Sequence, residues 1–316
     1  MRAIIGKRFG SPDRLELREV PTPTPGLGEL LVKVEATSVN PLDIQTRRGD
    51  YADYVSQPFK LGVDVAGVVA AIGNGVENFA VGDEVFYSTR VLENEGGYAE
   101  YHTERADLVA RKPASLSFAE AATLPIAAST AWVCLLERGR LRPGDRVLVL
   151  GGSGGVGLFA VQVARLSGAH VVATGRNEAQ GLVRELGADA TVDYRQPDSW
   201  QAVKALAPDG YDIVVDLVGG DAIQQSLGLL APGGRIVSIV DQPKPQNLYQ
   251  GWEFNAEVHL VFLSPSAERL GKVAAVVERG LLKPIIERTL PLADAAEAHR
   301  LIEAGGRAGK IVLTTS

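Results

Sequence analysis

The spacing of apolar and polar residues changes about a third of the way along the 316-residue chain. Residues 1–110 contain short segments in which apolar residues alternate with polar ones or form brief runs, as in residues 30–36 and 63–72. Such segments predict β-strands, and the proline-rich residues 21–28 predict an extended loop. Many short strands of this kind indicate a compact barrel or sandwich.

Helical patterns begin near Ser117. Ser117 and Glu120 match a capping box, which predicts a helix that Pro125 interrupts, and a second helix is predicted over residues 126–138. Strands and helices then alternate, with strands predicted at residues 147–150, 170–174, 190–192, 211–216, 234–240 and 259–263. This alternation predicts an α/β fold with a doubly wound parallel sheet of the Rossmann type.

The end of the chain is predicted to return to the first domain. Residues 285–290 and 310–314 have strand patterns, and residues 293–304 between them have a helical pattern. We therefore expect a β-rich domain built from residues 1–118 and 283–316, and a nucleotide-binding domain built from residues 119–282.

Residues 147–164 contain the strongest chemical signal. Four apolar residues lead into five glycines within seven positions, and a long apolar helical pattern follows. Gly152 to Gly157 spell G-x-G-x-x-G in the strand–turn–helix context that dinucleotide binding requires. Residues without side chains let the backbone approach a pyrophosphate, and the helix that follows presents unpaired N–H groups to it. An ordinary glycine-rich turn is the alternative.

Composition excludes several classes of function. Hydrophobic residues make up 46% and charged residues 22% of the chain, as in soluble globular proteins, and the net charge of −6 argues against a nucleic-acid partner. One cysteine rules out a disulfide within the chain, which fits a reducing compartment. Charges among the first eight residues argue against a signal peptide, and the glycines in residues 147–164 argue against a membrane span. We expect a cytoplasmic protein.

The end of the second Rossmann strand indicates which dinucleotide binds. An NAD site normally has an acidic residue there, which bonds the ribose 2′-hydroxyl. This chain has Gly175 and Arg176, and Arg176 is suited to a charge-assisted bond with a 2′-phosphate. Tyr194, beyond the third strand, can add a hydroxyl. We therefore predict NADPH as the cofactor, the alternative being that Arg176 is a solvated residue before a helix.

Together, these motifs resemble the medium-chain dehydrogenase/reductase superfamily, and specifically its zinc-free quinone oxidoreductase branch, which includes zeta-crystallin. The resemblance covers essentially the whole chain. It implies that the β-rich domain is a GroES-like barrel. It rests on several motifs in the same order as in the family, at residues 40–43, 61–67, 81–85, 97–101, 128–132, 151–157, 214–220 and 309–313.

The resemblance also implies that zinc is absent. Zinc-dependent relatives carry a cysteine at the position of Asn40, a His-Glu pair at Val63 and Asp64, and a further ligand near Ile126. Neither Asn40 nor Val63 is a usual zinc ligand, and one cysteine cannot build a four-cysteine structural lobe. Cys134 lies in an apolar helical stretch and is expected to be a buried thiol.

The implied activity is hydride transfer from NADPH to a quinone or an α,β-unsaturated carbonyl compound. Such acceptors delocalise the resulting charge, so hydrogen bonds suffice in place of a metal. Asn40 is the candidate donor to the acceptor oxygen, or else a turn-stabilising residue before Pro41. Tyr51 and Tyr54 are candidates for stacking on a flat acceptor or for proton donation, with plain aromatic packing as the alternative.

The remaining predicted site residues belong to the cofactor. Asp43 and Asp64 are expected to be structural. Lys310 is predicted either to reach the cofactor or to be a surface lysine. Thr130 is predicted to bond the ribose or nicotinamide, or else to be a helix residue that bonds its own backbone. The other predicted contacts to the cofactor are Ser153, Gly154, Gly155, Val156, Val218, Ile239, Phe262 and Leu263.

Two other functions stay open at this point. One is a trans-acting enoyl reductase of a biosynthetic pathway, and the other is a non-catalytic NADPH-binding structural or regulatory protein. We also expect the sixth Rossmann strand to lie at the sheet edge and to pair with its copy in a homodimer.

Overall fold

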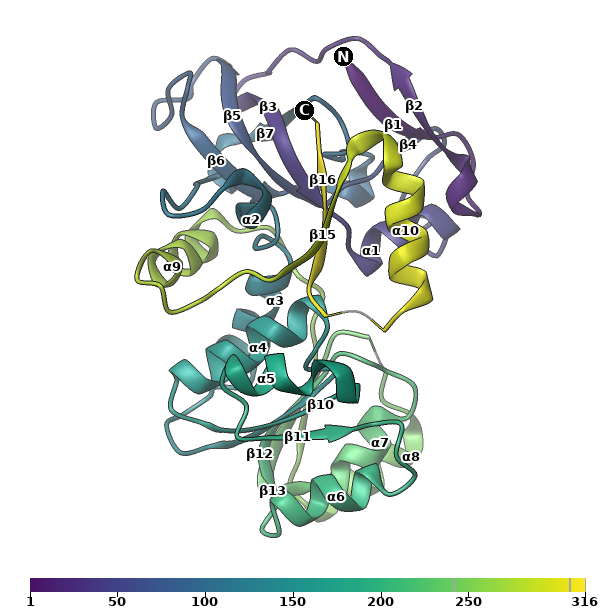
Figure 1. Cartoon of the computed structure of the whole chain (residues 1–316), viewed down its shortest axis with the longest axis vertical. Helices are drawn as coiled ribbons and strands as arrows, with labels where there is room; N and C mark the ends of the chain where they lie inside the picture. The colour runs from purple at the N-terminus through teal and green to yellow at the C-terminus, as the bar shows by residue number, and fades with distance from the viewer. Residues whose placement is uncertain (241, 307, 316) are drawn as a thin grey trace.

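The computed structural model describes residues 1–240, 242–306 and 308–315. It has a β-rich domain and a parallel-sheet domain stacked along the long axis of the molecule, with both chain ends in the β-rich domain (Figure 1). The predicted fold class, a Rossmann sheet domain combined with a β-rich domain, is therefore confirmed.

Two sheets form the β-rich domain. The larger has the order β15-β16-β3-β5-β6-β8, with β7 also paired to β3, and the smaller has the order β2-β1-β4. Alternate residues of β3, from Leu30 to Ala36, are buried, as its spacing predicts. The strands that precede the parallel sheet are β1 (Arg2–Gly6), β2 (Leu15–Glu19), β3 (Glu29–Ser38), β4 (Phe59–Lys60), β5 (Asp64–Ile72), β6 (Glu84–Ser88), β7 (Tyr101–Arg105) and β8 (Ala110–Arg111).

The second domain contains a six-stranded sheet in the order β11-β10-β9-β12-β13-β14, and every pairing in it is parallel. The order reverses between β9 and β12, which is where open α/β sheets bind nucleotides. The strands are β9 (Arg146–Leu150), β10 (His170–Gly175), β11 (Ala190–Asp193), β12 (Tyr211–Asp216), β13 (Leu230–Ser238) and β14 (Glu257–Leu260).

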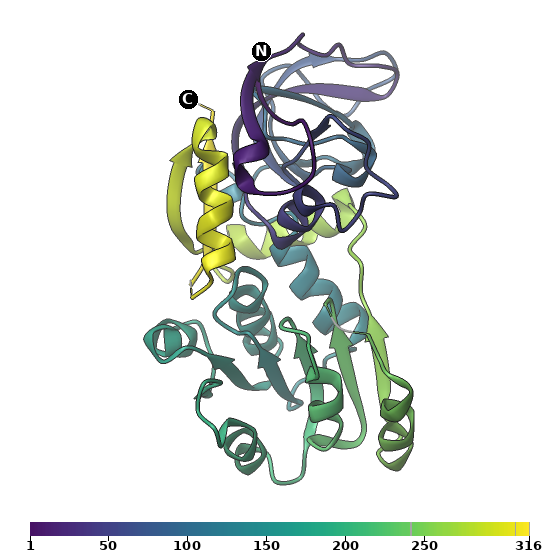
Figure 2. The same cartoon turned by 90° about the vertical axis from the view of Figure 1, so that its right-hand side faces the viewer.

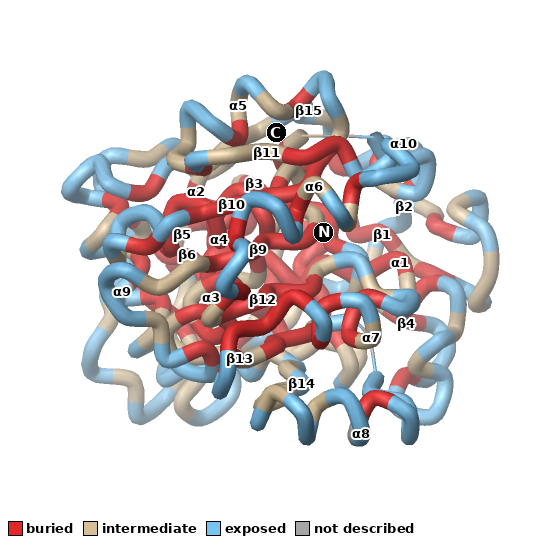
Figure 3. Tube along the Cα trace, turned by 90° about the horizontal axis from the view of Figure 1, so that it is seen from below, coloured by how far each residue is buried: buried red, intermediate tan, exposed pale blue. Residues whose placement is uncertain are grey.

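Helices cover both faces of this sheet. Apolar residues of α3, α4 and α9 share one buried cluster with one face, and residues of α6 and α7 share another with the opposite face. Figure 3 shows the buried central strands surrounded by exposed loops. The helices are α2 (Phe118–Ala121), α3 (Ala127–Trp132), α4 (Gly155–Leu166), α5 (Gln180–Glu185), α6 (Ser199–Leu206), α7 (Ala222–Leu227), α8 (Pro245–Glu253) and α9 (Ala267–Glu278).

The chain returns to the first domain at its end, as predicted. Strand β16 (Lys310–Thr314) lies between β15 (Ile286–Pro291), which is parallel to it, and β3, which is antiparallel. Helix α10 (Ala295–Ala304) lies along the β-rich domain, and its lower end points toward the Rossmann domain (Figure 2). This return places Lys310 at the junction of the domains.

Several local predictions were wrong. Helix α1 (Pro41–Arg48) was not predicted. Residues 241–254 match no motif and predict no helix, but residues 245–253 form α8, whose polar composition hides its helical pattern. Asp241 lies outside the described residues. Strand β14 ends at Leu260, so Phe262 and Leu263 follow the strand instead of ending it.

Candidate functional site

The glycine-rich turn joins β9 to α4 at the point where the strand order reverses. Gly151 has a left-handed φ of 82°, its N–H donates to Thr174 Oγ1 at 3.0 Å, and the N–H of Gly152 donates to the Thr174 carbonyl at 2.7 Å. A Cβ at Gly157 would lie 2.1 Å from the Gly151 carbonyl oxygen, so this close approach requires glycine.

The start of α4 fits an anionic group. Gly154 is the N-cap residue, and no side chain among the described residues caps the helix. The first N–H groups of a helix and its dipole both favour a negative charge. The residues present therefore fit the pyrophosphate of a dinucleotide, with Ser153, Gly154, Gly155 and Val156 at the turn.

The end of β10 brings together the residues predicted for the 2′-phosphate. The Arg176 Nε donates to the Tyr194 hydroxyl at 3.1 Å, and Ser153 lies beside Gly175. The guanidinium of Arg176 also lies against Gly306, which follows α10. Both Arg176 and Tyr194 are partly open to solvent.

A second arginine beside this pair was missed by the sequence analysis. Arg195 donates to Asp193 through Nε at 3.0 Å and through a terminal nitrogen at 2.7 Å, and it contacts Glu178 at 3.1 Å. Hydrogen bonding from Arg195 lowers the pKa of Asp193 to about 2. The available signal was the D-Y-R sequence at the end of β11, of which only Tyr194 was considered.

A buried polar cluster, made of Ser38, Asn40, Asp64 and Lys310, lies where the two domains meet. Lys310 Nζ donates to Asn40 Oδ1 at 2.5 Å and to the Val39 carbonyl at 3.2 Å, and it lies 3.4 Å from Asp64 Oδ2. Its alkyl chain packs against Gly155, where a Cβ would lie 2.8 Å from Lys310 Cδ. Lys310 is 4% exposed, so its alternative interpretation as a surface lysine is wrong.

Both the nitrogen and the oxygen of the Asn40 side-chain amide form hydrogen bonds within this cluster. Its Nδ2 donates to Asp64 Oδ2 at 2.7 Å and to the Ser38 carbonyl at 3.3 Å, while its Oδ1 accepts from Lys310. Asp64 also accepts the N–H of Ile126 at 2.8 Å and so connects β5 to the segment before α3. The cluster therefore fixes the orientation of Asn40 and connects the two domains.

Asp43 has the structural role expected of it. Its carboxylate accepts the N–H of Asn40 at 2.9 Å and the N–H of Gly62 at 2.8 Å, which holds the start of α1 against the segment before β5. Burial raises the pKa of Asp43 to about 7.

The two tyrosines predicted for the acceptor site, Tyr51 and Tyr54, have different surroundings in the structure. The rings of Tyr51 and Phe262 meet edge to face with centroids 6.4 Å apart, although the two residues come from different domains. Tyr54 is 72% exposed. Val218 and Phe262 are also exposed, Ile239 and Leu263 are half-buried, and Thr130 is buried in α3.

The described residues contain no group of three or more His, Cys, Asp or Glu placed to hold a metal ion. Cys134 is buried, as expected, and burial raises the pKa of its thiol to about 12. Within the described residues, no helix is both long enough and apolar enough to cross a membrane.

Comparisons with known proteins agree with this architecture. Residues 26–114 match the alcohol dehydrogenase GroES-like domain, and residues 186–313 match the zinc-binding dehydrogenase family. The chain is 34% identical to a quinone oxidoreductase from Mus musculus over 326 residues, covering 99% of this chain and 97% of the mouse protein.

Two solved structures are close to this fold but differ in their named cofactor. An NAD-dependent alcohol dehydrogenase has a TM-score of 0.94 and 35% identity, with 100% of both chains covered. A mycobacterial protein solved in complex with NADPH has a TM-score of 0.89 and 33% identity, with 99% of this chain and 100% of that chain covered.

Proposed function

The chain belongs to the zeta-crystallin-like quinone oxidoreductase group of the medium-chain dehydrogenase/reductase superfamily, and from this premise we propose that it is a zinc-independent reductase that transfers hydride from NADPH to a quinone or an α,β-unsaturated carbonyl compound. The observation that carries the choice of cofactor is the contact between Arg176 and Tyr194 at the end of β10. A guanidinium and a hydroxyl suit a phosphate better than a ribose hydroxyl.

The proposed cofactor site extends from Arg176 across the glycine-rich turn to the junction of the two domains, where Lys310 packs against Gly155. Gly175, Arg176 and Tyr194 bind the 2′-phosphate, and the turn from Ser153 to Val156 binds the pyrophosphate. The dihydronicotinamide supplies the hydride when NADPH is bound. Residues that follow β12, β13 and β14, together with one residue of α3, border its ring and ribose, namely Thr130, Val218, Ile239, Phe262 and Leu263.

On the acceptor side, aromatic side chains orient a flat molecule. Tyr51 and Phe262 supply aromatic surface from both domains. Asn40 is held at the junction of the domains by Lys310 and Asp64, so it reaches an acceptor oxygen only by exchanging one of its present hydrogen bonds. A conjugated acceptor suits such a site because its own π-system spreads the negative charge that hydride transfer creates.

Rapid mixing tests this proposal. The purified protein is preloaded with NADPH and mixed with 1,4-benzoquinone, 9,10-phenanthrenequinone or a cyclic enone, while the NADPH absorbance is followed. We expect loss of absorbance that saturates with acceptor concentration and is unchanged after treatment with a chelator. Tight NADPH binding without turnover on any acceptor would instead support a non-catalytic binding protein.

Replacing Arg176 by alanine is expected to weaken NADPH binding by about 1.5–3 kcal/mol, because a charge-assisted hydrogen bond to the 2′-phosphate is lost. NADH lacks that phosphate, so its affinity is expected to stay within about twofold. Fluorescence titration with both cofactors measures the difference. Equal losses of affinity for NADPH and NADH would show that Arg176 does not bind the 2′-phosphate.

We also propose that the protein forms a homodimer through β14. This strand is at the edge of the Rossmann sheet, and Leu260 at its end is 53% exposed. An uncovered edge strand offers N–H and C=O groups to a second copy. Sedimentation at micromolar concentration is expected to give twice the chain mass, and a monomer would overturn the proposal.

A further inference from the structure

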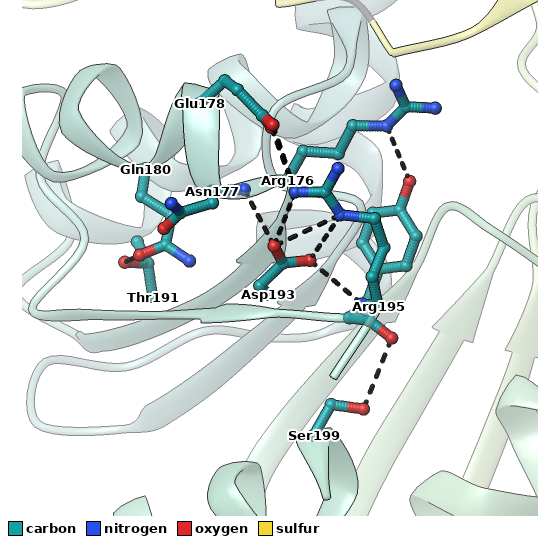
Figure 4. A network of polar contacts seen from close by, with 9 residues as sticks. Arg176, Asn177, Glu178, Gln180, Thr191, Asp193, Arg195 and Ser199 are labelled. Carbon is teal, nitrogen blue, oxygen red and sulfur yellow. Dashed lines mark hydrogen bonds and ion pairs between the residues drawn. The ribbon is translucent and has the colours of Figure 1, made fainter. Parts of the chain in front are cut away.

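Four charged side chains surround the turn that follows β10. Arg176 and Arg195 carry positive charges, and Glu178 and Asp193 carry negative ones, so the group is balanced before any ligand binds. Figure 4 shows that Arg195 lies between the carboxylates of Asp193 and Glu178, whereas Arg176 points away from them. The Nε of Arg176 donates to the Tyr194 hydroxyl. The two arginines therefore have different partners.

Arg195 is the residue that neutralises the acids. It forms ion pairs with Asp193 at 2.7 Å and with Glu178 at 3.1 Å, and its side chain is 42% exposed. Asp193 is almost buried at 8% exposure, and it also accepts the N–H of Asn177 at 3.2 Å. Arg176, by contrast, makes no ion pair with any described residue, so its charge is available to a ligand.

These contacts have an electrostatic consequence at the end of β10. A phosphate there carries between one and two negative charges near neutral pH, and nearby carboxylates repel it. Asp193 and Glu178 both border the turn that bears Arg176. Their repulsion is cancelled only while Arg195 pairs with them.

We propose that Arg195 determines the preference for NADPH over NADH by neutralising Asp193 and Glu178, without itself binding the cofactor. The inference rests on the proposed function, since it assumes that the 2′-phosphate lies beside Arg176. Arg195 is therefore a positioning residue, and the affinity for NADPH depends on a charge pair as well as on the arginine that contacts the phosphate.

The variants that test this are Arg195→Met, Glu178→Gln and the double variant. Arg165→Met is the matched control, because it removes an exposed arginine with an acidic partner, Asp189, at the far end of α4. Dissociation constants for NADPH and NADH are measured by fluorescence titration at low and high salt. Circular dichroism shows that each variant is folded.

Arg195→Met is expected to raise the dissociation constant for NADPH about 5- to 10-fold and that for NADH less than twofold. Glu178→Gln alone is expected to tighten NADPH binding about two- to fourfold, and in the double variant it is expected to recover most of the loss. The differences are expected to shrink at 0.5 M salt because screening weakens interactions between exposed charges. Arg165→Met is expected to change neither constant by more than about twofold.

Two outcomes would overturn the inference while leaving the proposed function intact. One is that the native protein prefers NADPH and Arg195→Met keeps the full preference. The other is that Arg195→Met weakens NADPH and NADH equally, which a purely structural role of the arginine would produce. A native protein without any preference for NADPH would instead overturn the proposed cofactor, and the inference with it.

Discussion

Replacing Gly157 with alanine is expected to weaken NADPH binding at least about 100-fold and to abolish turnover at ordinary cofactor concentrations. The new Cβ would lie 2.1 Å from the Gly151 carbonyl oxygen and 2.7 Å from the Gly152 Cα. Both neighbours are backbone atoms, and hydrogen bonds to Thr174 hold both residues in place. The turn must therefore move by about 1 Å to make room for the Cβ. A displacement of that size in a bound group can lower the rate or the affinity about 100-fold.

Gly181→Ala is the matched control for Gly157→Ala. Gly181 lies in α5 of the same domain, and a Cβ there would meet nothing within 4 Å. Because alanine favours helix, this variant is expected to be as stable as the native protein or more stable, by up to about 1 kcal/mol, and to bind NADPH normally. If Gly157→Ala bound NADPH within about threefold of the native protein, the close packing of the turn would not matter for binding.

The glycine-rich turn could be predicted because its information is local. Strand, turn and helix are consecutive in the sequence, and each glycine acts on neighbours a few residues away. The same holds for the capping box of Ser117 and Glu120, which the structure contains. The parallel sheet could be predicted for the same reason, because each strand and helix has its own local pattern. The position of β14 at the edge of that sheet was predicted as well.

The buried cluster of Ser38, Asn40, Asp64 and Lys310 could not be predicted in this way. Lys310 and Asn40 are 270 positions apart, and only the return of the chain through β16 brings them together. From the sequence, Lys310 had two possible environments, and no pattern near it indicated burial. Arg195 was missed for a related reason, because its role depends on partners from two segments, Asp193 and Glu178.

Replacing Asp64 with alanine is expected to destabilise the folded protein by about 3–5 kcal/mol. Asp64 is fully buried and accepts from Ser38, Asn40 and the N–H of Ile126, and it pairs with Lys310. Its removal leaves the ammonium of Lys310 buried with only neutral oxygen partners, which is the costly way to break a buried pair. Urea unfolding followed by circular dichroism measures the free energy of unfolding.

A double variant distinguishes the loss of the charge pair from the loss of side-chain packing. Asp64→Ala combined with Lys310→Met removes both charges, so the double variant is expected to regain about half or more of the lost stability. Burial already lowers the pKa of Lys310 from 10.5, and without Asp64 that pKa is expected to fall further. In the single variant the unfolded chain then binds the extra proton, so stability should rise as the pH increases toward 10.5.

On the proposed function, the cluster also affects hydride transfer, because Asp64 and Lys310 hold Asn40 between them. Asp64→Asn keeps the shape and one acceptor oxygen, so it is expected to cost less stability than Asp64→Ala. It should still slow hydride transfer in single-turnover measurements about 10-fold, with a smaller change in NADPH affinity. A loss of less than about 1 kcal/mol in Asp64→Ala, or no recovery in the double variant, would show that burial of this charge pair does not determine the stability of the folded protein.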